Sequence, residues 1–159
     1  MTEPVLIIDY GMGNIGSLRN MFRRIGIPTE VAADPSTVAR ARKLLLPGVG
    51  AFDAAMARIN QAGLAEVIRK RALEDGVPTL GICLGMQLLT HGSEEGKLPG
   101  LGLIPAFTRR FPGTLGLKVP HMGWNLVTAA SPSPLTTWFA GETRFYFVHS
   151  YFVEVVEQR

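Results

Sequence analysis

The stretch Val77-Pro-Thr-Leu-Gly-Ile-Cys83-Leu-Gly-Met-Gln-Leu-Leu89 predicts an apolar strand that turns sharply into a helix at the one cysteine of the chain. Gly81 and Gly85 flank Cys83 at positions where a strand-to-helix elbow has no room for a Cβ atom. Such an elbow exposes the sulfur, and the start of the following helix favours thiolate over thiol. The pattern therefore predicts a nucleophilic cysteine. The alternative is a buried free cysteine that acts as a small apolar side chain.

Strands and helices alternate in the part of the chain around and before this elbow. Buried strands are predicted at 5–9, 29–33, 43–46 and 77–82, and helices at 11–25, 35–42, 51–61 and 64–75. The alternation predicts an α/β fold with a doubly wound, mostly parallel sheet. Ligands of such folds bind at the carboxyl ends of the strands, where the glycine-rich segments of this chain lie.

After Gly92 the pattern changes, because glycine and proline recur every few residues. Strands joined by turns are predicted at 101–111, 126–129 and 144–156. The last is the strongest strand signal, and only three residues follow it. An apolar strand needs a neighbour and a covering layer. We therefore expect residues 1–159 to form a single domain whose β-rich C-terminal portion is incomplete.

Composition excludes several functional classes. The 159 residues carry a net charge of +3, but basic and acidic residues are interleaved, so we expect no nucleic-acid partner. A single cysteine suits a reducing compartment, and no signal peptide or membrane-spanning run is seen, so we expect a cytoplasmic protein without a membrane partner. The three histidines lack metal-ligand spacing, so neither a metal nor another cofactor is expected.

A second glycine-rich segment, Gly11-Met-Gly13-Asn-Ile-Gly16, matches the dinucleotide-binding fingerprint. It lies between a predicted strand and a predicted helix, and Asp34 follows the next strand, where a ribose-binding carboxylate would be needed. Two observations oppose this interpretation. Asp9 and Tyr10 are polar or bulky where cofactor strands are apolar, and Asp34, which precedes Pro35, is equally well placed to cap a helix.

Other residues around the elbow have both a functional and a structural interpretation. The Pro47–Gly50 loop has two interpretations. It either donates a backbone N–H to an oxyanion, with Leu84 N–H as the second donor, or it is a plain turn. Gln87, one turn after Cys83, is a candidate substrate contact or a polar surface residue. Trp124 lies with His121 in a predicted loop and is either an interface anchor or a core residue.

Five segments together resemble one family. They are Asp9-Tyr-Gly-Met-Gly-Asn14, Pro47-Gly-Val-Gly-Ala-Phe52, Gly81-Ile-Cys-Leu-Gly-Met-Gln87, Pro120-His-Met-Gly-Trp-Asn125 and Tyr146-Phe-Val-His-Ser-Tyr151. In this order, over residues 5–153, they are similar to the glutaminase subunit of imidazole glycerol phosphate synthase, a class I (triad) glutamine amidotransferase. The combination is far more specific than the glycine fingerprint and argues against nucleotide binding.

The resemblance implies a reaction and a partner. Cys83 would attack the side-chain amide of glutamine and release ammonia, leaving a glutamyl thioester for hydrolysis. Ammonia would pass to a (β/α)8-barrel cyclase, the partner in a heterodimer that makes imidazole glycerol phosphate and AICAR in histidine biosynthesis. The implied oxyanion-hole residues are Val49 or Gly50 with Leu84, the implied glutamine contacts are Gln87, His149, Ser150 and Tyr151, and the implied partner contacts are Asn14, His121, Met122, Trp124 and Asn125.

The chain departs from the family pattern in one respect. Members of the family continue to a His-Pro-Glu motif that supplies the catalytic base, and this sequence contains no such motif. General acid–base catalysis typically contributes a factor of ~10²–10⁴, so we expect this chain alone to be weak or inactive. The alternative function is a non-catalytic, glutaminase-like scaffold or binding subunit.

Overall fold

The computed structural model describes residues 2–113, 116, 118–139 and 141–155. The described residues form two compact units, one from residues 2–109 with 153–155 and the other from the described part of Arg110–Phe152. Each unit is described by itself.

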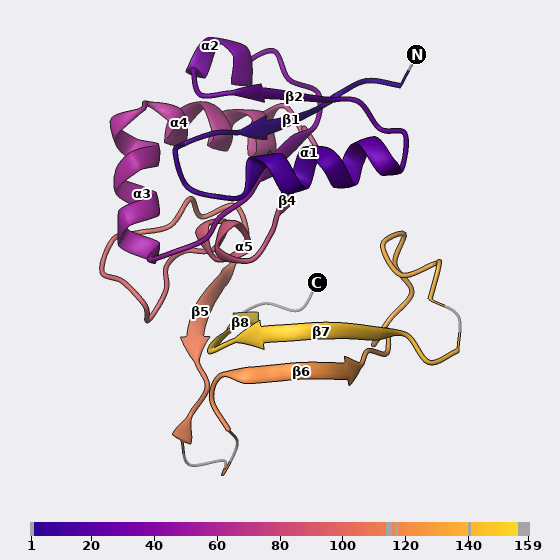
Figure 1. The fold of residues 1–159 in the computed structure, drawn as a ribbon. Coiled ribbons are helices and arrows are strands. Elements are labelled where there is room, and N and C mark those ends of the chain that lie inside the picture. The colour runs from indigo at the N-terminus through magenta and orange to yellow at the C-terminus, as the bar shows by residue number, and fades with distance from the viewer. Residues whose placement is uncertain (1, 114–115, 117, 140, 156–159) are drawn as a thin grey trace. The chain divides into compact units, whose positions relative to one another are not determined.

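A parallel four-stranded sheet forms the centre of the first unit (Figure 1). Its strands are β1 (Val5–Ile8), β2 (Thr29–Ala32), β3 (Leu44–Leu46) and β4 (Thr79–Gly81), in the order β2-β1-β3-β4. Consecutive residues such as Leu45 and Leu46 are both fully buried, although they point to opposite faces of the sheet. Burial on both faces explains the continuous apolar runs, and the predicted parallel α/β fold is confirmed.

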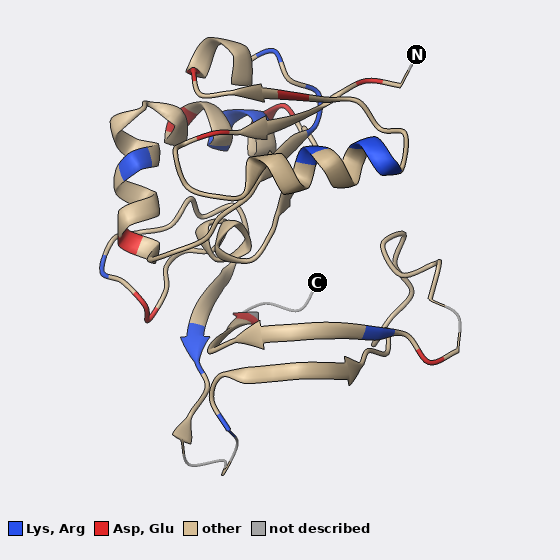
Figure 2. Ribbon diagram, viewed as in Figure 1, with Lys and Arg blue, Asp and Glu red and all other residues tan. Residues whose placement is uncertain are grey.

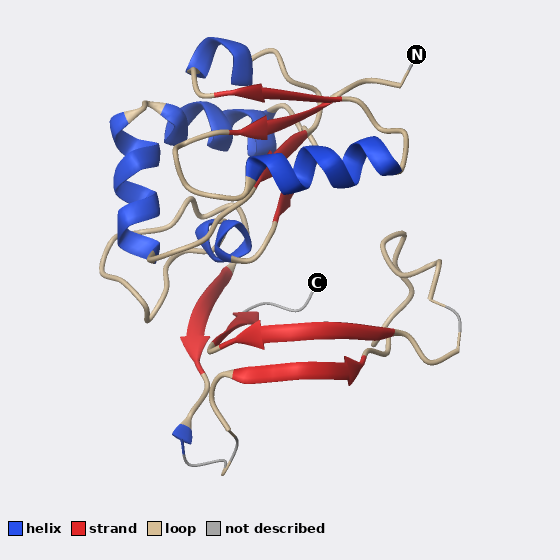
Figure 3. Ribbon diagram, viewed as in Figure 1, coloured by secondary structure: helices blue, strands red, loops and turns tan. Residues whose placement is uncertain are grey.

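Helices alternate with these strands (Figure 3). They are α1 (Ile15–Arg24), α2 (Pro35–Val38), α3 (Phe52–Gln61), α4 (Leu64–Arg69) and α5 (Leu84–Leu88). The helices α3 and α4 contribute Phe52, Ile59, Leu64 and Ile68 to the core, all without exposed surface. No helix in the described part of the chain is long and apolar enough to cross a membrane.

Three predicted helices differ from those observed. The helix predicted at 11–25 begins at Ile15, because Asn14 caps it. The helix predicted at 35–42 ends at Val38, and the following amides of Arg40 and Ala41 bond to carbonyls three residues earlier, which closes the helix into a turn. The helix predicted at 64–75 changes at Lys70 into a π-helical segment, η1 (Lys70–Glu74). The Asp75 amide accordingly bonds to the Lys70 carbonyl, a spacing wider than that of an α-helix.

The second unit contains an antiparallel ribbon of β6 (His121–Leu126) and β7 (Arg144–His149), in which His121 lies opposite His149 and Trp124 opposite Tyr146. The strand predicted at 126–129 is therefore wrong, and so is the loop predicted for His121 and Trp124. Pro120 and Gly123 resemble turn signals in the sequence. However, Gly123 adopts a φ of +134° inside the strand, where pairing with β7 holds it.

The other two predicted strands are shorter than expected. The run 144–156 divides at Ser150 into β7 and β8 (Tyr151–Val155), and Val156 lies outside the described residues. Only β5 (Ala106–Arg110), which pairs with β8, forms within 101–111. The amides of Leu101 and Leu103 instead bond to carbonyls at the end of α5, at 2.8 and 2.7 Å, and so close that helix.

Asp53 in the first turn of α3 holds the loop that precedes β5. Its carboxylate accepts the backbone N–H groups of Leu98 and Lys97, both at 2.9 Å, and these bonds lower its pKa below the usual value of 3.8. The Asp53→Ala variant should exchange the amide hydrogens of Lys97 and Leu98 several-fold faster, because both amides lose their hydrogen-bond acceptor. Amide exchange measured by mass spectrometry checks this, with Glu66→Ala as the control.

The rate of hydrogen exchange at the Lys97 and Leu98 amides should also depend on pH. Because folding lowers the pKa of Asp53, its contribution to stability is present above pH 3.8 and is lost as the pH falls below that value. Protection of Lys97 and Leu98 should decline in this acid range in the wild-type chain only. An equal decline in the Asp53→Ala variant would contradict the assignment.

Candidate active site

Cys83 lies at the elbow between β4 and α5, and its side chain is exposed. Its backbone has φ 55° and ψ −118°, and among the described residues it is the only non-glycine residue with a positive φ. Such a conformation costs ~1–3 kcal/mol and persists only where the surrounding structure imposes it. The exposed, strained cysteine matches the geometry predicted for a nucleophile and disagrees with the buried alternative.

Two glycines give the elbow its close packing. A Cβ atom on Gly85 would overlap the backbone carbonyl oxygen of Leu46 on β3, and one on Gly81 would lie 2.6 Å from Met86 Cα. Backbone atoms cannot move aside as the end of a flexible side chain can. The start of α5 is therefore pressed against the neighbouring strand, and this packing holds Cys83 in its strained conformation.

The Pro47–Gly50 loop at the end of β3 adjoins the elbow. A Cβ atom on Gly48 would lie 2.8 Å from the Gly85 amide nitrogen and 2.9 Å from Leu84 Cβ. Within the described chain, the backbone N–H of Leu84 has no hydrogen-bond acceptor. Leu84 and the loop that carries Val49 and Gly50 thus lie side by side at the carboxyl edge of the sheet, as a two-donor oxyanion hole requires.

Tyr10, which follows β1, is a residue of this region whose role was missed from the sequence. It is only 5% exposed, and its hydroxyl donates to the Pro47 carbonyl at 2.6 Å. Burial, and to a smaller extent the nearby Cys83, raise the pKa of Tyr10 to about 12. The only signal in the sequence was its position, directly after a buried strand and before the glycine segment.

The raised pKa predicts a stability change in alkali. Because folding raises the pKa of Tyr10 from 10.0 to about 12, its contribution to stability is full below pH 10 and is lost as the pH rises toward 12. The midpoint of urea unfolding should fall over this range in the wild-type chain and fall less in Tyr10→Phe. Equal slopes for the two proteins would contradict the assignment.

Gln87, the candidate substrate contact on α5, is half-buried. Its side-chain oxygen accepts a hydrogen bond from Ser93 Oγ at 3.3 Å. This contact orients the amide, and the role of Gln87 in glutamine binding stays a prediction.

Three further residues are predicted to contact glutamine. They are His149, Ser150 and Tyr151, and they belong to the second unit. There His149 Nδ1 lies 2.7 Å from the Tyr151 carbonyl and must donate to it, so His149 Nε2 accepts from His121 Nδ1 at 2.9 Å. His121 Nε2 in turn accepts from Asn125 Nδ2 at 3.2 Å. These bonds assign both imidazoles to single tautomers. Cross-strand pairing created this chain of hydrogen bonds, which the sequence did not reveal.

Two of the residues expected at a partner interface have large, exposed apolar side chains. Trp124 is 70% exposed and Met122 59%, so the core alternative for Trp124 is wrong. Asn14 is exposed and also caps α1, because its side chain accepts the Ser17 N–H at 3.1 Å. No observation tests whether a partner binds these residues.

The structure also favours the capping interpretation of Asp34. Its carboxylate accepts the Thr37 N–H at 2.8 Å and the Ser36 hydroxyl at 2.6 Å, and these bonds lower its pKa to about 2. A carboxylate occupied in this way at the start of α2 has a structural role. Among the described residues, no three His, Cys, Asp or Glu side chains are grouped so as to hold a metal ion.

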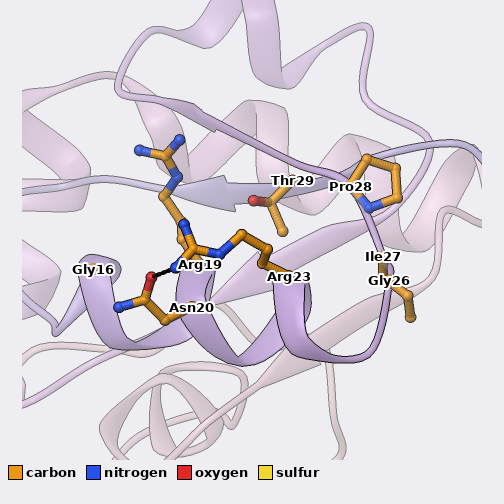
Figure 4. Close-up of a pocket in the computed structure, with 8 residues that line it drawn as sticks. All are labelled: Gly16, Arg19, Asn20, Arg23, Gly26, Ile27, Pro28 and Thr29. Carbon is orange, nitrogen blue, oxygen red and sulfur yellow. Dashed lines mark hydrogen bonds between the residues drawn. The ribbon is translucent and has the colours of Figure 1, made fainter.

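A surface depression of about 630 Å³ lies over α1 and the start of β2 (Figure 4). Arg19 and Arg23 line it, and Arg23 donates to Asn20 at 2.9 Å. The helix α1 carries arginines but no acidic residue (Figure 2). None of the predicted catalytic or substrate-binding residues lines this depression, so it is not the candidate active site.

A strained, exposed thiol on a strand-to-helix elbow of a parallel sheet, beside a glycine loop, is typical of enzymes that transfer acyl groups through a cysteine. The comparisons agree. A family model described as "Glutamine amidotransferase class-I" matches residues 6–159. The chain belongs to this family.

Similar proteins place the chain, within this family, among the HisH glutaminase subunits of imidazole glycerol phosphate synthase. The chain is 48% identical over 149 residues to "Imidazole glycerol phosphate synthase subunit HisH 2" of Methanococcus maripaludis, covering 94% of this chain and 74% of that protein. It is 52% identical over 152 residues to subunit HisH of Moorella thermoacetica, covering 95% and 71%. A glutamine amidotransferase structure from Thermotoga maritima shares the fold, with a TM-score of 0.65 at 18% identity, over 98% of this chain and 64% of that one.

Proposed function

We propose that this chain carries the glutaminase chemistry of an imidazole glycerol phosphate synthase, hydrolysing glutamine to glutamate and ammonia through a thioester on Cys83. The observation that carries the proposal is the exposed Cys83 at a φ of 55°, next to the unpaired Leu84 N–H. Support for glutamine as the substrate comes from the family and from the names of the relatives. We also propose that residues 1–159 belong to one amidotransferase domain in the cytoplasm.

The geometry supports a two-step mechanism. The Cys83 thiolate forms a bond to the side-chain amide carbon of glutamine, and negative charge develops on the amide oxygen. The N–H of Leu84 and that of Val49 or Gly50 stabilise this oxyanion, each such donor being worth ~3 kcal/mol. The nitrogen then takes up a proton from solvent and leaves as ammonia as the carbon–nitrogen bond breaks, and water hydrolyses the thioester to glutamate and the free Cys83 thiol.

For the acceptor of ammonia we propose a (β/α)8-barrel cyclase subunit, bound in a heterodimer of the histidine pathway. The relatives are named as subunits of a synthase. Exposed Trp124 and Met122 on β6 are suited to such an interface, because large apolar side chains anchor protein contacts. Asn14, His121 and Asn125 complete the proposed contact set.

Glutamine γ-hydroxamate tests the catalytic proposal. Its leaving group, hydroxylamine, is a weaker base than ammonia and depends less on a general acid. Incubation with the chain should form a γ-glutamyl thioester on Cys83, detected by intact mass and peptide mapping, followed by release of glutamate. Absence of both the adduct and glutamate, with the thiol still alkylated by iodoacetamide, would favour the alternative of a non-catalytic scaffold.

A further inference from the structure

Tyr10 is a buried polar residue next to the candidate site, and the proposed mechanism does not use it. It lies just beyond β1, the strand paired with β3, and it is 5% exposed. Its hydroxyl donates to the carbonyl of Pro47, the first residue of the loop at the end of β3. The distance of 2.6 Å is short for a hydrogen bond between hydroxyl and carbonyl oxygens.

This hydrogen bond fixes an element of backbone geometry. Because a peptide group is planar, holding the Pro47 carbonyl also holds the plane that contains the Gly48 N–H. A Cβ atom on Gly48 would lie 2.7 Å from the same hydroxyl oxygen, 2.8 Å from the Gly85 amide nitrogen and 2.9 Å from Leu84 Cβ. The loop therefore packs closely against both the Tyr10 phenol and the start of α5.

The segment after Tyr10 packs against the same loop. A Cβ atom on Gly13 would lie 3.3 Å from Pro47 Cβ, and one on Gly50 would lie 2.8 Å from Met12 Cε. The aromatic ring of Tyr10 and these contacts provide packing, and among the described residues the phenol hydroxyl is the hydrogen-bond donor to the Pro47 carbonyl. Burial raises the pKa of Tyr10 to about 12, so the hydroxyl remains a donor throughout the neutral range.

We propose that Tyr10 is a positioning residue, whose buried hydroxyl holds the Pro47–Gly50 loop in the conformation that presents a backbone N–H to the oxyanion formed at Cys83. The proposal rests on the proposed glutaminase function. It assigns no proton transfer to Tyr10, because its hydroxyl is committed to Pro47. The role is transmitted entirely through the loop.

Tyr10→Phe tests the proposal, since it removes the hydroxyl and retains the ring. With glutamine γ-hydroxamate, kcat should fall about 10- to 100-fold, less than or similar to the loss of a whole oxyanion donor, while KM stays within about 3-fold. Alkylation of Cys83 by iodoacetamide is a direct displacement without an oxyanion, so its rate should stay within about 2-fold. Tyr146→Phe, an exposed tyrosine on β7, is the matched control and should change none of these values.

A second measurement does not depend on turnover. In amide NMR spectra, Tyr10→Phe should shift the resonances of Gly48, Val49 and Gly50, whereas Tyr146→Phe should leave them in place. Unshifted loop resonances, an unchanged kcat, or an equal fall in the hydroxamate and iodoacetamide rates would overturn the proposal. If the wild-type chain forms no adduct with the hydroxamate, the glutaminase proposal fails, and the NMR comparison still decides whether Tyr10 positions the loop.

Discussion

Replacing Cys83 with alanine should abolish release of glutamate from glutamine γ-hydroxamate, lowering the rate by a factor of about 10⁴ or more and leaving no covalent adduct. The reason is chemical: the chain contains one cysteine, and the proposed thioester forms on its sulfur. No other side chain lies at a strained elbow among the described residues. Glutamate should be measured over time, and the adduct by intact mass.

The control for this prediction lies on the opposite edge of the sheet. Val31 on β2 is 39% exposed, and β2 is the edge strand away from β4. Val31→Ala should retain the wild-type rate within about 2-fold, as expected for a surface substitution away from the site. Glutamate release that persists in Cys83→Ala at the wild-type rate would show that Cys83 is not the nucleophile, provided that circular dichroism shows both variants to be folded.

Gly85→Ala should destabilise the chain by about 3 kcal/mol or more, because the added methyl group would overlap the Leu46 carbonyl oxygen. Strand β3 and helix α5 would have to separate, and β3 carries the fully buried Leu45 and Leu46. Urea unfolding followed by circular dichroism measures the change. The same variant should also slow alkylation or acylation of Cys83, since the elbow conformation depends on this packing.

At Gly16, a glycine-to-alanine substitution is expected to raise the stability of the chain, not to lower it. This glycine lies in the first turn of α1, where φ is not positive, and its nearest neighbour to an added Cβ is the Asn14 side chain at 4.0 Å. Gly16→Ala should stabilise the chain by about 0.5–1 kcal/mol, through the better helix propensity of alanine. A similar loss of stability at both positions would mean that backbone crowding at the elbow does not explain the effect.

Prediction of the site from the sequence succeeded where neighbours along the chain decide the geometry. The spacing of Gly81, Cys83 and Gly85 predicted an elbow, and Gly81 is indeed crowded by residues of the turn itself, whereas the crowding at Gly85 comes from Leu46 on the neighbouring strand. Tyr10 was missed because its partner, Pro47, is 37 residues away. Nothing in the local pattern of an aromatic residue after a strand indicates which carbonyl its hydroxyl will reach.

The β-rich segment shows the limits of local prediction. Apolar content predicts where its strands lie, and glycine and proline predict where they end. These signals place His121 and Trp124 in a loop. In the structure β6 contains Gly123 and begins directly after Pro120, because pairing with β7 supplies the backbone hydrogen bonds. The linked imidazoles of His121 and His149 follow from the register of that pairing, which no single segment specifies.

The sequence by itself determined the parallel α/β sheet, the order of its elements, the elbow at Cys83 and the family. These depend on hydrophobic periodicity, on glycine at fixed spacing and on motif order, all of which are read along the chain. Tertiary structure alone decided the contact between the Pro47–Gly50 loop and α5, the hydrogen bond from Tyr10 to that loop, the exposure of Trp124 and the extent of the β6–β7 ribbon. Each of these features depends on contacts between residues that are distant in sequence. The free energy of such contacts comes from burial and hydrogen bonding, which exist only after the chain has packed.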